Sequence, residues 1–426
     1  MTERVFLHVG APKSGTTYLQ NVLALNREKL AAAGIAVVGE RHLDRVHAGM
    51  VVREDRRLAD LPPAAAEAWG RLVAQIRRWQ GPTAVLSYEL FAGASADQAA
   101  RALSDLSGLE VHVVITARDF ARAVPSAWQE RLKFALTTPL EEWRPKGEKA
   151  GPRAEWGWRT MDPAKVAARW GATLPPDRVH VITMPKSKAH RDELWHRFAA
   201  ACGIDVPGLE MNVERTNESL GVVAAEVLRR VNVAVGDRLV GNREQARWLR
   251  DTLAHGVLAG LDSESIGATD EQVADAARRS RRAIRAITEA GYDVRGELGD
   301  LEASRPGGRT PGQVSDSEIA ELAVRALAEL LLRQAAEADE APVPRRSPRQ
   351  AARGLVSRAT AGLVDRRATA LEEKARDLEG QLAELRALQL RVADLSDLVR
   401  ELLLPAAKAD SKVTGAALRR YRQESV

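Results

Sequence analysis

The stretch that decides the fold is residues 5–20, which read VFLHVGAPKSGTTYLQ. It begins with apolar residues of strand character, passes through a loop rich in Gly, Pro and Ser, and continues with helical apolar spacing. A strand–loop–helix unit of this kind brings backbone N–H groups and the positive end of a helix to one point, where a phosphate group binds. We therefore expect an anion-binding loop there. The alternative is a helix start that binds nothing.

The loop differs from that of nucleoside-triphosphate-binding proteins in the position of its lysine. Gly10 and Gly15 are separated by four residues, as in the first part of the P-loop motif. In that motif a lysine directly follows the second glycine and reaches the β- and γ-phosphates. Here Thr16 takes that place, and the lysine of the loop is Lys13. Lys13 lies too early for a triphosphate, but it is placed to contact a group attached to a single 5′-phosphate.

The six residues that read PKSGTT closely resemble the 5′-phosphosulfate loop of sulfotransferases, which use 3′-phosphoadenosine 5′-phosphosulfate (PAPS) as donor. Lys13 is then placed to stabilise the charge that appears on the bridging oxygen as the S–O bond breaks. No metal is required in this interpretation. The residues that we expect to bind the donor at this loop are Pro12, Lys13, Ser14, Gly15, Thr16 and Thr17.

A second donor anchor is implied by the same resemblance. Sulfotransferases hold the 3′-phosphate of the donor with an Arg at a strand end and a Ser eight residues later, in the next helix. Arg118 and Ser126 match that spacing. The alternatives are a surface salt bridge for Arg118 and an inert position in the first turns of a helix for Ser126.

The candidate general base is Glu89. It follows an apolar strand, and residues 86–89 resemble the Ser-x-Glu sequence found in many bacterial sulfotransferases, whereas other members of the family have His at the comparable place. A carboxylate beside the donor loop can accept the proton of the attacking group. The alternative is that Glu89 is a structural partner of Arg118 or Lys13.

Strands and helices alternate along the first half of the chain. This pattern predicts βαβ units and an α/β fold with a parallel sheet flanked by helices, with ligands at the carboxyl ends of the strands. The Lys13 loop, Glu89 and Arg118 all fall at that edge. The resemblance extends over about residues 1–300 and implies the P-loop-like sulfotransferase fold. We expect strands at residues 35–38, 83–87, 111–116 and 178–183, and helices at residues 16–33, 64–79, 121–136 and 192–202.

The domain organisation is predicted from shifts in composition. A catalytic domain over residues 1–303 is followed by an α-helical, partly coiled-coil extension. Leu and Val spaced by four and three residues predict a coiled coil that self-associates through residues 371–402; the alternative is an amphipathic helix packed on its own domain. The expected segments beyond the catalytic domain are a linker (304–316), a helix (317–337), a basic Pro/Arg linker (338–365), a coiled-coil helix (366–404) and a tail (405–426).

The charge of the chain is concentrated in one segment. The net charge is +5, and residues 341–370 carry seven Arg against one Asp, or +6, which leaves −1 for the remainder. We therefore expect no nucleic-acid partner. The basic segment has no aromatic anchors, so a solvated linker is favoured over contact with an anionic membrane. No apolar run spans a bilayer, no leader precedes the first strand, and Cys202 is the only cysteine, so we expect a cytoplasmic protein.

Three functions remain open at this level. The favoured one is PAPS-dependent sulfuryl transfer to a hydroxyl or amine of a carbohydrate, a glycosylated metabolite or a lipid metabolite. An ATP-dependent small-molecule kinase is disfavoured by Thr16 and because the third and fourth strands end in Ser87 and Thr116 and not in an acid that could hold Mg²⁺. A non-catalytic scaffold would use the coiled coil and keep a vestigial nucleotide domain.

Overall fold

The computed structural model of the chain describes residues 1–147, 156–186, 192–213 and 219–340. The chain divides into two compact units, Met1–Leu330 and Leu331–Val426. The first unit contains the sheet and the candidate site, and the following paragraphs concern that unit.

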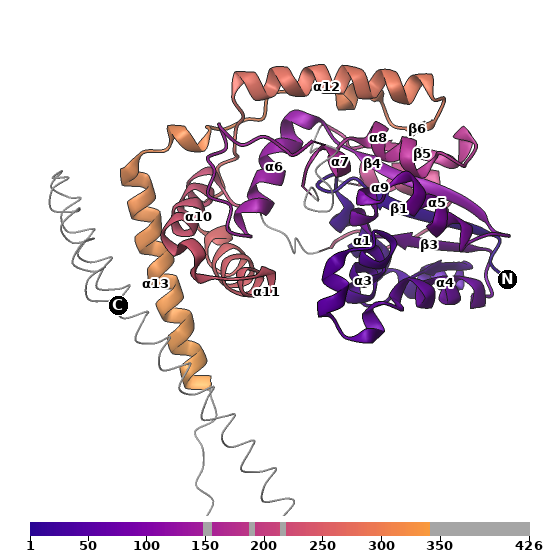
Figure 1. The fold of residues 1–426 in the computed structure, drawn as a ribbon, viewed down its shortest axis with the longest axis horizontal. Helices are drawn as coiled ribbons and strands as arrows, with labels where there is room; N and C mark the ends of the chain where they lie inside the picture. Colours follow the sequence, from indigo (N-terminus) through magenta and orange to yellow (C-terminus); the bar gives the residue numbers. More distant parts are fainter. Residues whose placement is uncertain (148–155, 187–191, 214–218, 341–426) are drawn as a thin grey trace, which may run out of the picture. The chain divides into compact units, whose positions relative to one another are not determined.

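A six-stranded parallel sheet forms its centre, with the strand order β2-β3-β1-β4-β5-β6 (Figure 1). This confirms the predicted α/β class. Because β1 lies between β3 and β4, the segments that follow these three strands meet at one edge of the sheet. The strands are β1 (Arg4–Gly10), β2 (Ile35–Val37), β3 (Thr83–Ser87), β4 (Glu110–Ala117), β5 (Val179–Thr183) and β6 (Asp293–Arg295).

Helices cover both faces of the sheet (Figure 1). The first nine α-helices of the described residues are α1 (Thr16–Leu25), α2 (Arg27–Ala32), α3 (His42–Val52), α4 (Ala68–Arg78), α5 (Ala96–Ser104), α6 (Phe120–Leu132), α7 (Trp158–Met161), α8 (Pro163–Trp170) and α9 (Glu193–Cys202). Those that follow are α10 (Val222–Val235), α11 (Asn242–Gln245), α12 (Asp270–Glu289) and α13 (Asp316–Glu340). A π-helix, η7 (Ala246–His255), continues directly from α11, and a 3₁₀-helix, η3 (Glu89–Gly93), follows β3.

The alternation of side chains along β1 divides the core in two. Val5, Leu7 and Val9 join the larger cluster, which includes buried residues of α5, α6, α8, α10 and α12. Phe6 joins the smaller cluster on the other face, together with residues of α1, α2 and α9. A strand that is apolar on both faces is typical of a parallel sheet covered by helices on each side.

Two expected helices end earlier than their sequences indicate. The helix expected over residues 16–33 is divided at Asn26, whose buried side chain donates to Glu210 O and accepts from Glu210 N at 2.8 and 2.7 Å. The helix expected over residues 121–136 ends at Leu132, and Asn232 Nδ2 donates to the carbonyl oxygens of Leu132 and Leu136 at 2.8 and 2.9 Å. In both cases an asparagine side chain at the helix end joins it to a segment that is distant in the sequence.

The segment expected to be a linker, residues 304–316, lies within the unit Met1–Leu330 and is bonded to it. Ser304 Oγ donates to Asp119 at 2.6 Å, Arg309 forms ion pairs with Glu264 and Glu318 at 2.8 Å each, and Gly312 N donates to a carboxylate oxygen of Glu141 at 2.7 Å. The compact unit therefore extends beyond the expected boundary at residue 303. The helix expected over residues 317–337 is found as α13.

The remaining predictions for the C-terminal part stay predictions. The basic segment from residue 341 on, the coiled coil at 366–404 with its self-association, and the tail at 405–426 lie outside the described residues. Among the residues that are described, no helix is both long and apolar enough to cross a bilayer.

Candidate functional site

The loop between β1 and α1 requires glycine at two positions. Gly10 has a φ of 147°, and a Cβ atom there would lie 2.8 Å from Ala92 Cβ and 2.9 Å from Glu89 O. Gly15 has a φ of 87°, and a Cβ atom there would overlap the side chain of Leu194. A residue with a Cβ atom fits at neither position unless the neighbouring atoms of Glu89, Ala92 or Leu194 move. The loop is therefore held tightly between η3 on one side and α9 on the other.

Helix α1 begins at the end of this loop with features that favour an anion. Its N-cap is Gly15, with no side-chain hydrogen bond to the first turn, and that turn contains no acidic residue. The positive end of the helix dipole is thus not compensated within α1, and an anion placed there is stabilised by the first N–H groups. The binding of a phosphate at this loop stays a prediction.

The hydroxyl group of Ser14 is used to build the loop. The buried Ser14 Oγ donates to Ala11 O and lies 2.5 Å from Thr116 Oγ1. Sequence reasoning had placed this hydroxyl among the groups that bind the phosphate. In the structure the side chain of Ser14 joins the loop to the end of β4.

His8 connects the ends of three strands beneath the loop. Its ring nitrogens lie 2.8 Å from Ser87 Oγ at the end of β3 and 3.1 Å from Thr116 Oγ1 in β4. Burial lowers the pKa of His8 to about 3, so the ring is neutral at neutral pH. A neutral ring with one donor and one acceptor nitrogen fits between two hydroxyl groups, each of which can donate or accept.

Lys13, in a left-handed backbone conformation with φ of 66°, reaches a carboxylate on α6. Its Nζ lies 2.8 Å from Glu130 Oε1, and the buried Lys133 Nζ lies 2.8 Å from the same oxygen. Burial alone would raise the pKa of Glu130, but the two ammonium groups outweigh that effect and lower it to about 2. Burial lowers the pKa of Lys133, and its ion pair with Glu130 opposes that change. Glu130 is therefore ionised at neutral pH and shared by two lysines.

The structure brings together the two residues proposed for the 3′-phosphate. Arg118 Nη1 lies 3.4 Å from Ser126 Oγ and donates to Lys13 O at 3.1 Å. Burial lowers the pKa of Arg118, which is half-buried between β4 and α6. Arg118 therefore contacts both the backbone of the Lys13 loop and the helix that follows β4. Arg118 is thus half-buried and bonded to Lys13 O and Ser126, which differs from the alternative of a surface salt bridge.

Glu89 lies beside the loop at the first position of η3. It accepts a hydrogen bond from Gln20 Nε2 at 2.8 Å, and Gln20 is one helical turn after Thr16 on α1. The alternative partners that sequence reasoning left open, Arg118 and Lys13, are engaged elsewhere, the latter with Glu130. The hydrogen bond thus joins Glu89 of η3 to the neutral amide of Gln20 on α1.

Charged groups of α3 and η7 interact electrostatically with Glu89 and Lys133. Burial lowers the pKa of His42 at the start of α3, and Arg45 and Arg250 lower it further while Glu89 raises it. Burial also lowers the pKa of His255, with Lys133 adding to the effect. Sequence reasoning missed these groups and Glu130. Glu130 lies one turn after Ser126 on α6, so the sequence alone could have placed it near Ser126. No local sequence signal predicts that the π-helix η7 lies near the Lys13 loop.

An acidic residue does follow β4, but it has a structural role. Asp119 is buried, caps α6 by accepting from Ala121 N at 2.8 Å, and accepts from the hydroxyl group of Ser304 at 2.6 Å. In the described part of the chain, no three His, Cys, Asp or Glu side chains are grouped so that they could hold a metal ion.

Comparisons with known proteins add three findings. Residues 371–425 match the model of a domain of unknown function, DUF6752. No curated protein matches the chain. Among solved structures, a sulfotransferase domain from the curacin biosynthetic pathway is similar, with 14% sequence identity and a TM-score of 0.32 over 69% of this chain and 99% of that chain.

Replacing Glu130 by Gln should destabilise the protein at pH 7 by about 3 kcal/mol, because it leaves Lys133 charged and buried without a partner. The double variant Glu130→Gln/Lys133→Met should regain most of this loss. Because the folded-state pKa of Glu130 lies below its usual value of 4.5, its stabilisation is present above that pH and is lost as the pH falls towards about 2.

Urea unfolding of the wild type and these variants from pH 7 to pH 3 measures both effects, with the exposed Glu289→Gln as the matched control. If the single variant is as stable as Glu289→Gln, Glu130 does not compensate a buried lysine.

Proposed function

We propose that this chain transfers a sulfuryl group from PAPS to a hydroxyl or amine of a carbohydrate, a glycosylated metabolite or a lipid metabolite. One observation carries the proposal. Arg118 joins Ser126 to the backbone of the Lys13 loop, so the two elements expected to bind the 3′- and 5′-phosphates of one nucleotide are neighbours, although Arg118 and Lys13 are 105 positions apart in the sequence. The spelling of the loop, PKSGTT, supports the same donor by its resemblance to sulfotransferases.

The donor would be held at two places by groups that the fold provides. The N-terminus of α1, from Gly15 to Thr17, would bind the 5′-phosphate through backbone N–H groups and the threonine hydroxyls. Arg118 and Ser126 would bind the 3′-phosphate, to which a guanidinium group can donate two hydrogen bonds. The position of Lys13 within the loop suits a single 5′-phosphate with an attached sulfuryl group better than a triphosphate chain.

The chemical step needs electrostatic stabilisation and a base. As the S–O bond of the donor breaks, its electron pair moves to the 5′-phosphate, and Lys13 would stabilise the charge that develops there. Glu89 would take the proton of the acceptor as the new bond to sulfur forms. Lys13 would leave Glu130 to do this, and Lys133 would keep the half-buried carboxylate of Glu130 paired. Because Lys13 would exchange its ion pair with Glu130 for one with the 5′-phosphate, the free-energy cost of this movement would be limited.

Adenosine 3′,5′-bisphosphate should raise the melting temperature by about 5 °C at a concentration about 100 times its Kd. ATP with Mg²⁺ should not. The variant Arg118→Ala should lose the advantage of this nucleotide over adenosine 5′-monophosphate, because only the 3′-phosphate distinguishes them. The exposed Arg56→Ala is the control and should keep the advantage. Equal stabilisation of the wild type by adenosine 3′,5′-bisphosphate and by ATP with Mg²⁺, or stabilisation by ATP alone, contradicts the proposed donor.

Lys13→Ala should lower kcat by about 10²–10³-fold without unfolding the protein, because it removes a charge needed in the transition state.

Glu89→Gln should lower kcat by about 10²-fold or more while leaving the Kd of adenosine 3′,5′-bisphosphate unchanged. Transfer from labelled PAPS to a panel of hydroxyl and amine acceptors measures both, with Lys29→Ala on α2 as the control. Wild-type rates in Lys13→Ala refute its role, and wild-type rates in Glu89→Gln move the base to another residue.

A further inference from the structure

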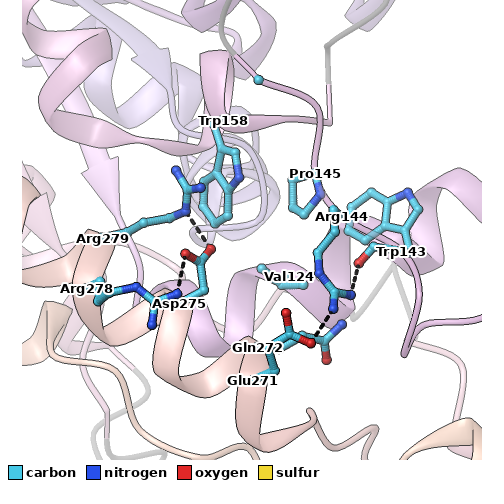
Figure 2. Close-up of a pocket in the computed structure, with 11 residues that line it drawn as sticks. Val124, Trp143, Arg144, Pro145, Trp158, Glu271, Gln272, Asp275, Arg278 and Arg279 are labelled. Carbon is cyan, nitrogen blue, oxygen red and sulfur yellow. Dashed lines mark hydrogen bonds and ion pairs between the residues drawn. The ribbon is translucent and has the colours of Figure 1, made fainter.

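A pocket with a volume of about 370 Å³ lies between α12 and the chain around residues 143–147 (Figure 2). Val124 of α6 and the indole rings of Trp143 and Trp158 give it an apolar side. Charged residues of the first turns of α12 give it a polar side, among them Glu271 and Asp275. The volume is within the range of small-molecule binding sites. None of its lining residues belongs to the donor loop or to the Arg118–Ser126 pair.

The guanidinium groups at this pocket are held in fixed orientations. Arg279 Cζ lies 4.1 Å from the centre of the Trp158 ring, and Arg279 Nε is 2.7 Å from an oxygen of Asp275 (Figure 2). Arg278 contacts the other oxygen of Asp275 at 3.2 Å. Across the pocket, Arg144 Nη2 is 2.7 Å from Glu271. Each pair occupies part of a guanidinium fork, and a guanidinium group has five N–H donors, so donors remain for a ligand.

A row of arginines continues from the pocket along α12. Its members are Arg278, Arg281, Arg282 and Arg285, and all four are exposed. Their spacing of three and four residues places them on one side of the helix, and Ala276, Ala283 and Ile287 are buried on the opposite side. The last three members of the row form no ion pair with another described residue. The row extends for about 10 Å at 1.5 Å per residue.

We propose that this pocket and the arginine row together bind an acidic oligosaccharide, a chain of sugar rings that carry carboxylate or sulfate groups. A pocket with two indole rings and polar walls fits a sugar ring, which has apolar faces and a hydroxylated rim. The row fits a single line of anionic groups that extends from that ring. Guanidinium groups form two parallel hydrogen bonds with a carboxylate or a sulfate, which favours these substituents over neutral ones.

Two other polyanions fit the same features less well. A membrane surface is bound by helices that insert apolar side chains beside their basic residues, but the apolar side of α12 is buried in the protein. Nucleic acid needs a broader basic surface, and the chain outside residues 341–370 carries a net charge of −1. Neither partner gives a role to the pocket next to the row.

The inference does not depend on the proposed sulfuryl transfer, because binding is measured without a nucleotide. The probe is a tetragalacturonate, and its methyl ester serves as a neutral ligand of the same sugars. Calorimetry with the full chain should detect the acid and not the ester. The triple variant Arg281→Gln/Arg282→Gln/Arg285→Gln should bind about tenfold more weakly, as three exposed charge contacts would predict. Arg144→Gln at the pocket should weaken binding as well.

The control triple variant, Arg56→Gln/Arg238→Gln/Arg243→Gln, loses the same charge from exposed positions outside α12 and should bind like the wild type. Absence of binding of the acid, equal binding of the ester, or equal loss in both triple variants overturns the proposal. A DNA duplex or anionic vesicles that bind more tightly than the tetragalacturonate, with the same dependence on Arg281, Arg282 and Arg285, also overturn it in favour of that partner.

Discussion

The site depends on the hydrogen bonds that Thr116 makes at the end of β4. Its hydroxyl group donates to Gly10 O and contacts Ser14 and His8, and its carbonyl oxygen accepts from Ala11 N at 2.8 Å. These bonds attach the loop that follows β1 to the neighbouring strand. The side chain is fully buried, so its bonds are not exchanged with water. A loop attached in this way is held in place at the start of α1.

Beside this loop, one carboxylate is paired with two lysines. Glu130 is shared by Lys13 and Lys133, and the loss of either partner leaves it paired with the other. Lys133 is buried and belongs to the helix, while Lys13 belongs to the loop and is partly exposed. Departure of Lys13 from Glu130 therefore leaves neither the carboxylate nor a buried ammonium group unpaired, whereas departure of Glu130 from Lys133 would leave a buried ammonium group unpaired.

Much of the fold was open to prediction because its signals are local. The apolar stretch of residues 111–116 becomes β4 with one residue added at each end, and Ser95 caps α5 with Gln98 as a capping box. The contacts that determine the helix ends are not local. Asp262 caps α10 by accepting from Val223 N at 2.8 Å, and no spacing within residues 222–235 indicates a cap 39 residues away.

The same distinction applies to the site. The loop and the Arg118–Ser126 pair were identified by their spelling and spacing, and the structure brings them together. The pairing of Lys13 with Glu130, the bond from Gln20 to Glu89 and the use of the Ser14 hydroxyl group within the loop depend on how β1, β3 and β4 are ordered. The sequence predicts parallel strands but does not order them. Charge partners between distant elements therefore emerged only from the folded chain.

The most direct test of the account is a crystal structure of the protein with adenosine 3′,5′-bisphosphate. The account predicts the 5′-phosphate at the N-terminus of α1, the 3′-phosphate between Arg118 and Ser126, and the Lys13 ammonium group turned from Glu130 towards the 5′-phosphate. A nucleotide bound elsewhere, or a loop that stays empty in crystals saturated with it, would contradict the account.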